Sequence, residues 1–405
     1  MTLPHLASLL VALPLLVFSL RRLIFTIAAL ASPQRLSPPA PPPSFPNLLV
    51  LIPCRDDGPS LPPLVDALSQ NGYPPDHLRL LLIDDGSRSH TALLIDELTA
   101  QTPGAAALHL SPGRGKAAAL NAALVAEPWG EIIAVYDADH RPQPGGLLAL
   151  VAPFADPQVA AVSGRTEAAN ALVSASAYYS ASERLVHQRL TMAAKDRLHL
   201  APAILGSHCA YRRSVLATLG GFLPGAFLED TDLTLRLAAA GLRTRFVESI
   251  PAIDQAPATL NAYWRQHVRW GRGFQDVALG RERRRPSGPQ SAPPLSFWLR
   301  LELFLFSLGY LDRLALLAAA GLLLSDAILP THFDFPAWFF IAVLVLPYLQ
   351  VIAALVRTHK PWAWWLRLPF LLLIFPVDLL AAARSTLDTL LNRPRQWTPT
   401  TRTSP

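Results

Sequence analysis

The hydrophobic pattern divides the chain into an apolar start, a long middle of alternating strand and helix patterns, and an apolar end. Leu3–Leu20 is almost entirely apolar, and roughly eighteen such residues approach the length that a helix needs to cross a bilayer. Arg21-Arg22 interrupts the run, and the proline-rich segment 32–46 predicts an extended linker. Because no basic segment precedes the apolar run, we expect a retained anchor with the arginine pair on the cytoplasmic side, rather than a cleaved signal peptide.

From Asn47 onward the pattern is typical of a soluble α/β domain. Short apolar runs that end at proline or aspartate alternate with segments of helical periodicity. This alternation favours a doubly wound, mostly parallel sheet. The predicted strands are 48–52, 78–83, 107–110 and the run from Glu131 into Asp137, and the predicted helices are 61–70, 93–99 and 116–126.

Asp137 and Asp139 follow the last of these apolar runs. Along an extended strand end the two side chains project to the same side, and Ala138 leaves room between them. Open α/β sheets bind their ligands at the carboxyl ends of strands. Two oxygen donors at that edge suit a divalent cation that also holds phosphate. A turn in which both acids cap backbone amides is the alternative.

Two further segments face the same predicted crevice. Asp84 and Asp85 end the second strand, where carboxylates can accept from a uracil N–H or from ribose hydroxyls, although an ordinary Asp-Gly turn has the same residues. The loop 111–115 leads into the helix that begins at Lys116, and its glycines, amides and cation suit a diphosphate. Since the loop lacks the full P-loop spacing, a glycine-rich loop with a solvated lysine explains it equally well.

Composition places part of the chain in a membrane. The 405 residues are 51% hydrophobic and only 16% charged, and their mean hydropathy is +0.29, which is unusual for a purely soluble protein. With Cys54 and Cys209 as the only cysteines, a disulfide framework and a cysteine zinc cluster are excluded. The net charge of +6 gathers beside apolar segments, as positive-inside flanks do, which argues against a nucleic-acid surface. These flanks are Arg21-Arg22, 281–285, 357–360 and 393–402.

The C-terminal third contains several apolar segments. The segment 297–311 carries charged residues, including Glu302, that suit a helix lying in the membrane interface. The segments 314–329 and 337–356 are predicted to cross, and tryptophans after 360 form an aromatic belt. The segment 368–383 contains two prolines and Asp378, so we expect it to enter the membrane and return. A buried core helix is the alternative for each segment.

Two more motifs lie between these regions. Glu229, Asp230 and Asp232 begin a predicted helix, where acids often serve only as partners of the helix dipole. A carboxylate near Asp139 is also what a general base for a sugar hydroxyl requires. In Gln266-x-x-Arg269-Trp270, Gln266 and Trp270 share a helix face with Arg269 beside them, although an amphipathic interface helix has the same pattern.

In this order, and bracketed by membrane segments, the four motifs resemble those of the membrane-integrated family 2 glycosyltransferases, which include cellulose, chitin, hyaluronan and poly-N-acetylglucosamine synthases. They are Asp84-Asp85-Gly86-Ser87, Asp137-Ala138-Asp139, Glu229-Asp230 and Gln266-x-x-Arg269-Trp270. The resemblance covers 48–276 well and the membrane plan loosely. It implies a cytoplasmic GT-A domain with an α/β fold, a nucleotide-sugar donor, and inversion by a single displacement.

The resemblance also implies roles for single residues. Asp84 and Asp85 would hold the uridine of a UDP-sugar, and Asp137 with Asp139 would hold Mg²⁺ or Mn²⁺ on the diphosphate. Asp230 would be the catalytic base. Lys116, Gln266, Arg269 and Trp270 would bind the donor or border the acceptor. The segment 206–209 resembles the loop that meets the acceptor sugar, and 396–402 a cytoplasmic tail. The loop 53–57 departs from the usual pattern of relatives, which leaves the first nucleotide-contacting loop open.

Two acceptors fit these observations. The leading hypothesis is a synthase that extends a polysaccharide and passes it through its own helices, as the intact Gln266-x-x-Arg269-Trp270 motif favours. The alternative is a glycolipid synthase that adds one or a few sugars to ceramide, diacylglycerol or a polyprenyl carrier, since few crossing helices make a thin channel. An inactive membrane scaffold is disfavoured because the catalytic carboxylates are present.

We therefore expect a multi-pass protein of the inner or plasma membrane, with membrane lipid as a partner and without nucleic acid. The predicted organisation is a membrane anchor at 1–31, a linker at 32–46, a glycosyltransferase domain at 47–276, a basic linker at 277–296, interfacial and transmembrane helices at 297–390, and a cytoplasmic tail at 391–405.

Overall fold

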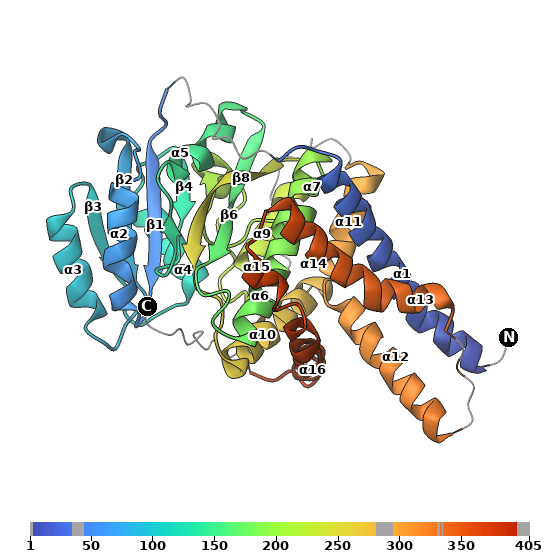
Figure 1. Cartoon of the computed structure of the whole chain (residues 1–405). Helices are drawn as coiled ribbons and strands as arrows, with labels where there is room; N and C mark the ends of the chain where they lie inside the picture. The colour runs from blue at the N-terminus through green and yellow to red at the C-terminus, as the bar shows by residue number, and fades with distance from the viewer. Residues whose placement is uncertain (1–2, 35–43, 281–294, 330–332, 334, 395–405) are drawn as a thin grey trace.

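A computed structural model describes residues 3–34, 44–280, 295–329, 333 and 335–394. Its centre is a single eight-stranded sheet (Figure 1). The strands are β1 (Leu48–Cys54), β2 (Leu78–Asp84), β3 (Ala105–His109), β4 (Ile132–Val135), β5 (Arg141–Pro142), β6 (Val159–Ala168), β7 (Cys209–Arg212) and β8 (Arg243–Asp254).

The strand order is β3-β2-β1-β4-β7-β6-β8-β5. The first four strands are parallel to one another. β7 then runs antiparallel to both β4 and β6, β8 is parallel to β6, and β5 is antiparallel to β8. The parallel half therefore brings the ends of β1, β2 and β4 to one edge, which is where an open α/β sheet binds its ligands.

Helices cover both faces of the sheet because alternate residues of β1 and β2 point to opposite sides. Leu48, Val50 and Ile52 pack on one face with side chains of α2 and α5, while Leu49 and Leu51 pack on the other with those of α4 and α9. The helices of this domain are α2 (Leu61–Ser69), α3 (Thr91–Gln101), α4 (Lys116–Ala126), α5 (Gly146–Val151), α6 (Ala175–Val186), α7 (Ala193–Arg197), α8 (Arg213–Thr218), α9 (Glu229–Ala239) and α10 (Leu260–Ala278).

The predicted α/β fold is confirmed, and each predicted strand and helix of 48–136 is present within a few residues of its expected bounds. The later strands β6, β7 and β8 were not predicted. They belong to the part of the sheet that contains antiparallel pairs, where β7 has only four residues and the pairing of β6 with β8 shifts its register at two points. Such short or interrupted elements leave little periodicity to read.

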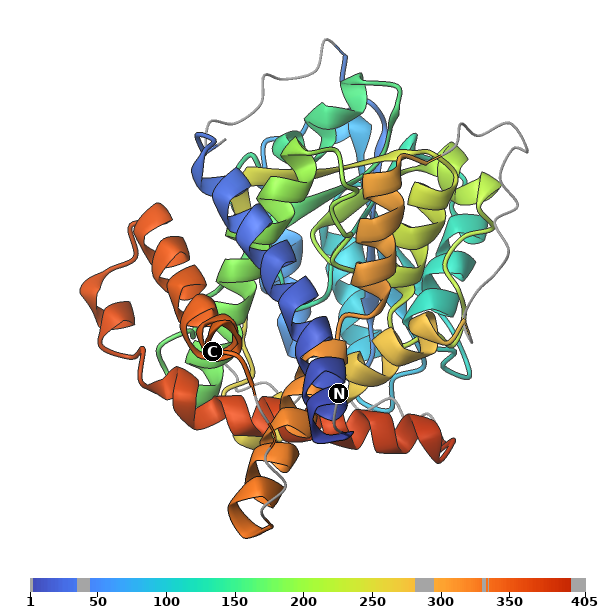
Figure 2. The same cartoon turned by 90° about the vertical axis from the view of Figure 1, so that its right-hand side faces the viewer.

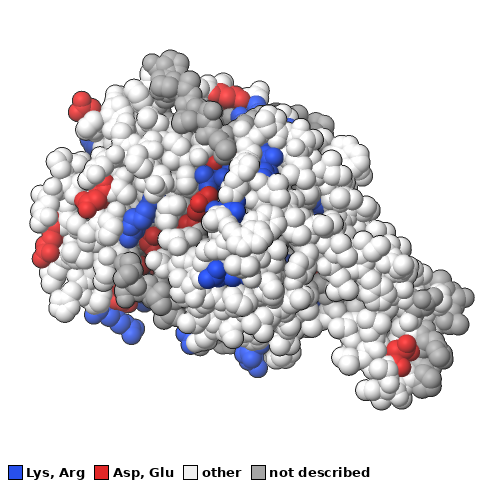
Figure 3. Space-filling view, in the orientation of Figure 1, with Lys and Arg blue, Asp and Glu red and all other residues white. Residues whose placement is uncertain are grey.

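The remaining helices pack beside this domain and project from it (Figures 1 and 2). They are α1 (Leu3–Leu30), α11 (Phe297–Ser307), α12 (Leu311–Ile328), α13 (Ala337–Phe340), α14 (Leu346–Arg357), α15 (Trp362–Trp365) and α16 (Phe370–Leu390). By length and composition, Pro4–Leu30, Ala337–Arg357 and Phe370–Leu390 could cross a membrane, as could α11 and α12 together. On the face in Figure 3, charged side chains lie mainly over the sheet domain, and the projecting end is almost white.

The contacts of α1 change the interpretation of the charges in 297–311, and α1 itself is continuous through Arg21 and Arg22. Arg21 donates to both carboxylate oxygens of Glu302 in α11 at 2.7 Å, and Arg22 pairs with Asp312 in α12. Glu302 and Asp312 are 4% and 2% exposed. The charges that suggested an interfacial segment therefore face protein, where buried ion pairs compensate them.

α16 corrects a second prediction. The segment expected to enter the membrane and return forms one continuous helix of 21 residues, with Pro376 inside it. α16 packs against α10, α6 and α12, so its polar face is directed at protein. The bend that was expected here lies instead between α11 and α12, which meet at 58°. The basic flank at 281–285 and the tail motif at 396–402 lie outside the described residues.

Candidate active site

A cavity of about 2010 Å³ opens at the carboxyl ends of β1, β2 and β4. Among its lining residues are Asp85, Lys116, Asp137 and Asp230 from the sheet domain. The cavity also reaches Gln266, Arg269 and Trp270 on α10. Motifs that are up to 185 residues apart in the chain (85 to 270) thus meet around one space.

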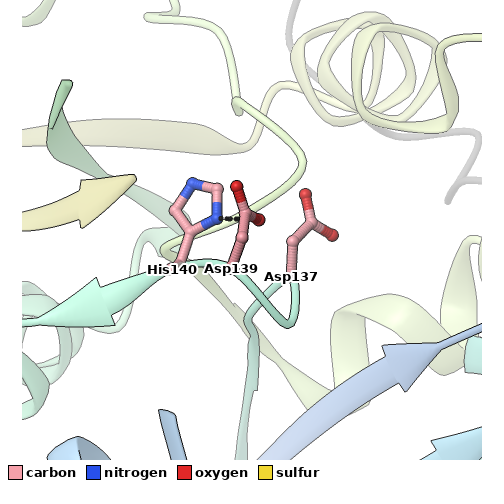
Figure 4. Close-up of side chains that lie close together, drawn as sticks. All are labelled: Asp137, Asp139 and His140. Carbon is pink, nitrogen blue, oxygen red and sulfur yellow. Dashed lines mark hydrogen bonds and ion pairs between the residues drawn. The ribbon is translucent and has the colours of Figure 1, made fainter. Parts of the chain in front are cut away.

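Asp137 and Asp139 lie side by side, but in a turn and not along an extended strand (Figure 4). β4 ends at Val135, and the His140 N–H donates to the Asp137 carbonyl at 3.0 Å, which closes the turn. The Asp137 N–H also donates to the Ser207 hydroxyl at 2.9 Å. The turn therefore brings the carboxylates together, and the predicted strand geometry was wrong in this detail.

His140 joins the two aspartates as a third ligand candidate. One ligand atom from each of Asp137, Asp139 and His140 lies within 4.8 Å of the others. His140 Nδ1 is 3.1 Å from Asp139 Oδ1, and its Nε2 is 3.6 Å from Asp254 Oδ2. Burial alone would lower the pKa of His140, but the two carboxylates outweigh it and raise that pKa. Carboxylate and imidazole ligands fit a divalent cation such as Mn²⁺.

Sequence reasoning missed His140, although it directly follows the Asp137-Ala138-Asp139 motif. Its ring is held by Asp254 at the end of β8, and Asp254 in turn pairs with Arg184 of α6. Neither contact has a signal in the local pattern, since the partners are 114 and 44 residues from His140 in the chain (254 and 184).

Lys116 contacts three residues of the site, on three different segments of the chain. Its ammonium donates to Asp137 Oδ1 at 2.7 Å and to the Gly206 carbonyl at 2.8 Å, and lies 3.4 Å from Glu229 Oε1. Burial alone would raise the pKa of Asp137, but Lys116 outweighs it and lowers that pKa. Asp137 therefore remains a carboxylate, the form that binds a cation.

Asp84 and Asp85 are buried, and their carboxylates accept hydrogen bonds from backbone N–H groups. Asp85 accepts from the backbone N–H of Arg114 at 2.6 Å and from that of Gly115 at 2.8 Å. Asp84 accepts from the Ser87 N–H at 2.9 Å. Asp85 thereby shapes the glycine loop that leads to Lys116, and it lines the large cavity. Direct contact of either aspartate with a nucleotide remains a prediction.

Asp230 begins α9 beside Glu229, and its carboxyl group borders the cavity. Burial, reinforced by the negative charge of Glu229 and opposed by Lys116, raises the pKa of Asp230 to about 7. Gly206 packs so closely that a side chain there would lie 2.7 Å from Asp230 Oδ2. A carboxyl group that titrates near neutrality is suited to accept a proton.

Asp232, two residues farther on, has a different environment. Its Oδ2 accepts from Arg236 Nε at 2.7 Å, one turn later in α9, and Arg236 also donates to the carbonyls of Leu219 and Gly221. Asp232 therefore belongs to the packing of α9, and it does not line the cavity in the described structure.

The α10 motif faces the cavity as predicted, with Gln266, Arg269 and Trp270 all half-buried at its wall. His267, between them, also lines the cavity and belongs to a buried ionic cluster that the sequence did not predict. Its Nε2 is 3.1 Å from Glu183 Oε2 of α6, and its ring stacks on Tyr263 with a centroid distance of 3.7 Å.

This cluster, Glu183, His267, Arg313 and Asp378, joins four helices. Arg313 of α12 donates to Asp378 Oδ2 of α16 at 2.7 Å and to Glu183 Oε1 at 3.1 Å. Asp378 is 1% exposed. An acid inside an apolar helix requires such a partner. The cluster ties α6 and α10 of the sheet domain to α12 and α16.

Beyond the cluster the same cavity continues between apolar helices. Its lining there includes Leu15 of α1, Leu316 of α12, and Leu372 and Phe375 of α16. One continuous space therefore connects the acidic site to side chains of three helices that include candidate membrane spans.

Comparison with known proteins identifies the family. Residues 46–273 match the family described as "Glycosyltransferase like family 2". The chain is 30% identical over 239 residues to the probable glycosyltransferase YdaM of Bacillus subtilis, covering 58% of this chain and 57% of that protein. It is 27% identical over 237 residues to a beta-monoglucosyldiacylglycerol synthase of Synechocystis, covering 56% and 48%.

A third relative is an N-acetylglucosaminyltransferase of Rhizobium meliloti, 28% identical over 253 residues, covering 58% of this chain and 57% of that protein. The chain thus spans about half the length of these curated relatives. The structure of mannosyltransferase PcManGT from Pyrobaculum calidifontis, in complex with GDP-Man and Mn²⁺, has a similar fold, with a TM-score of 0.64 and 22% identity over 95% of this chain and 99% of that one. Because the family match spans more than half of its length, the chain belongs to glycosyltransferase family 2.

Proposed function

We propose that the protein is a metal-dependent, inverting hexosyltransferase that transfers a sugar from a nucleoside-diphosphate donor to a hydroxyl group of a membrane lipid. The observation that carries this proposal is the single cavity that runs from Asp137 and Asp230 to the apolar side chains of α1, α12 and α16. A lipid acceptor has a polar head that fits the part of the cavity near Asp137 and Asp230. Its acyl or prenyl chains fit the part lined by α1, α12 and α16.

At the donor end, Asp137, Asp139 and His140 would hold Mg²⁺ or Mn²⁺. When bound, the cation would neutralise the diphosphate and stabilise it as a leaving group. Lys116 supplies positive charge 2.7 Å from Asp137, and Arg269, Gln266 and Trp270 line the same cavity, where we assign them to the diphosphate and the acceptor. We assign the donor as a UDP-sugar, with Asp84 and Asp85 fixing the loops around the base.

The chemical step requires one base. Asp230, as a carboxylate, takes the proton of the acceptor hydroxyl while the acceptor oxygen forms its bond to the anomeric carbon. The bond between that carbon and the diphosphate oxygen breaks, and the diphosphate leaves with the electron pair. A single displacement of this kind inverts the anomeric centre, and Asp230 releases its proton to water afterwards.

A polysaccharide acceptor is the second candidate. Trp270 and the intact α10 motif at the cavity wall favour it, because a flat ring can stack on a sugar of a growing chain. Some relatives are named N-acetylglucosaminyltransferases. The apolar side chains of Leu15, Leu316, Leu372 and Phe375 in the lining favour the lipid, because they offer no hydrogen bonds to the hydroxyl groups of a polysaccharide.

The proposed setting is the inner or plasma membrane, with α1, α12 and Ala337–Arg357 crossing it and the sheet domain in the cytoplasm. In support, Arg357 and Lys360 lie where α14 ends beside the sheet domain, in keeping with basic flanks on the cytoplasmic side. Because α16 packs along α10, we propose that it lies at the interface instead of crossing.

The test uses the full chain in detergent with radiolabelled UDP-sugars, Mn²⁺, and either diacylglycerol, ceramide or a polyprenyl phosphate. Label that enters the organic phase only when a lipid is added supports the proposal. High-polymer product that forms without added lipid supports the polysaccharide candidate. If no donor is consumed under any condition, including with GDP-sugars, the transferase assignment is wrong.

A further inference from the structure

A second charged site lies outside the catalytic cavity. Five cations lie near Glu248, in the middle of β8, or near Glu167 at the end of β6, and we call them the arginine cluster. They are Arg165 of β6, Arg189 of the π-helical turn, Arg197 of α7, Arg357 of α14, and Lys360 just after α14. None of these five side chains, all within the described residues, lines the catalytic cavity.

The carboxylates near the cluster are too few to neutralise it. Glu248 lies 3.1 Å from Arg197 Nη2, but 3.6 Å from Arg189 Nη1 and 4.0 Å from Arg357 Nη2. The last two separations are too long for hydrogen bonds. Glu167 pairs with Arg165 and lies 3.6 Å from the Lys360 ammonium. Within the described residues, five cations thus share two carboxylates.

Several guanidinium N–H groups in the cluster are buried without a hydrogen-bond partner in the described structure. They are Arg189 Nε and Nη1, Arg197 Nη1, and Arg357 Nε and Nη2. Glu248 Oε2, which Arg189 Nη1 and Arg357 Nη2 face at 3.6 and 4.0 Å, likewise has no hydrogen-bond partner within the described residues. Arg189 is 5% exposed and Arg357 is 9% exposed. Burial and the neighbouring Arg165 lower the pKa of Arg189 to about 10. Buried donors and unbalanced positive charge are costly unless an anion accepts from them.

The cluster also lies where two candidate membrane helices end. Arg357 is the last residue of α14, and it donates to the Ser32 carbonyl at 3.1 Å, just after α1 ends at Leu30. Arg197 donates to the Pro33 carbonyl at 2.6 Å. Beside these arginines in the chain, Leu198 and Val356 are 44% and 57% exposed. Cations next to exposed apolar side chains at helix ends are typical of the membrane interface.

We propose that the arginine cluster binds a phosphate group. Guanidinium groups hold phosphate through paired N–H donors. The guanidinium groups of Arg189, Arg197 and Arg357 come from three elements and lie within 3.1–4.0 Å of the same Glu248 carboxylate. The phosphate belongs either to the headgroup of an anionic membrane lipid or to a free phosphate ion. Its position at the ends of α1 and α14 suits a lipid headgroup, which lies at that depth of the bilayer.

A phosphate bound here would fix the position of the sheet domain relative to α14. Arg165 belongs to β6 of that domain, whereas Arg357 ends the candidate membrane helix α14 and Lys360 follows it. A phosphate between them adds contacts to both parts, so its binding stabilises the packed arrangement. The catalytic chemistry does not require this site.

The test measures thermal unfolding of the full chain reconstituted in phosphatidylcholine, with or without phosphatidylglycerol, and in detergent with inorganic phosphate. The probe variant is Arg197→Gln with Lys360→Gln, since both positions lie at the rim of the cluster. Arg243→Gln is the matched control, because Arg243 pairs with Asp156 on the surface outside the cluster. Arg197→Lys keeps the positive charge, so it shows whether a change of side chain at this position by itself disturbs folding.

We expect phosphatidylglycerol to raise the melting temperature of the wild type and of Arg243→Gln. In the double variant, half-maximal protection should require about tenfold more of the anionic lipid, as expected from the loss of charge-assisted hydrogen bonds. Protection by phosphatidylglycerol alone identifies a lipid headgroup, and equal protection by inorganic phosphate identifies the free ion. The proposal is overturned if neither anion protects the wild type, or if the double variant responds as Arg243→Gln does.

Discussion

The cavity has two parts that differ in the side chains lining them. We call the part around Asp137 and Asp230 the donor half, and the part lined by side chains of α1, α12 and α16 the acceptor half. In the donor half, Lys116, Asp137 and Asp85 have hydrogen-bond partners within the protein. In the acceptor half, mostly apolar side chains of separate helices line the space, together with polar ones such as Arg21, Arg22 and Gln350. The ionic cluster around Arg313 holds α12 and α16 to the sheet domain.

The difference suggests a division of labour. A preorganised polar half suits one fixed ligand geometry, such as a diphosphate and its cation, because the donors and acceptors are already in place. An apolar half recognises its ligand mainly through burial, which is proportional to area and tolerant of shape. Substitutions in the two halves should therefore affect different kinetic parameters.

The largest expected effect comes from Asp230→Asn. Because an amide cannot take the acceptor proton, turnover should fall about 10²–10⁴-fold, while the affinity for UDP-sugar stays nearly unchanged. The measurement is initial rate together with donor binding by calorimetry. Asp232→Asn is the control, since Asp232 pairs with Arg236 and should affect stability more than turnover. Equal loss in both variants would mean that this helix start is structural.

Metal dependence should be nearly as strong. Chelation with EDTA should abolish transfer, and added Mn²⁺ or Mg²⁺ should restore it, because the diphosphate would otherwise leave unneutralised. Asp139→Asn should lower metal affinity by about 10–100-fold and shift the Mn²⁺ concentration needed for half-maximal rate accordingly. Full activity in excess chelator would remove the metal assignment.

Substitutions in the acceptor half should have smaller effects, and they should change the KM for the lipid. Leu316→Trp reduces the space at the apolar end of the cavity, so the KM for the lipid should rise about tenfold while donor affinity stays the same. Leu324→Trp, on the same helix but 66% exposed, is the control and should change little. A loss of donor affinity in Leu316→Trp would contradict the separation of the two halves.

The smallest expected effect is on the pH profile. A base must be deprotonated, so the rate should be present above the pKa of Asp230, about 7, and fall as the pH drops below it. Glu229→Gln removes a negative charge that raises this pKa, so the acid limb should move to lower pH. The measurement is kcat/KM from pH 5 to 9, and an unchanged limb would show that another group sets it.

Much of the donor half could be predicted from the sequence, because local patterns encode it. A strand signal followed by Asp137, or a glycine loop followed by Lys116, places a side chain at the sheet edge without knowledge of the rest. The sequence also placed Gln266 and Trp270 on one helix face, as the structure has them.

What could not be predicted depends on contacts between distant segments. Glu302 suggested an interfacial helix because its partner, Arg21, is 281 residues away. Asp378 suggested a re-entrant loop because its compensation by Arg313 is invisible in the local pattern. His140 and the arginine cluster likewise acquire their roles only when β8, α6 and α14 come together.

The central claim is that the donor and a lipid acceptor share one cavity, and photo-crosslinking tests it most directly. A lipid acceptor with a diazirine in its acyl chain would be irradiated with the full chain, Mn²⁺ and UDP, and the labelled peptides would be mapped by mass spectrometry. We predict that the label enters the cavity-lining residues Leu316, Leu372 and Phe375 and that the unlabelled acceptor competes it away. Label confined to outward-facing residues such as Leu324 and Leu373, or insensitive to competition, would contradict the account.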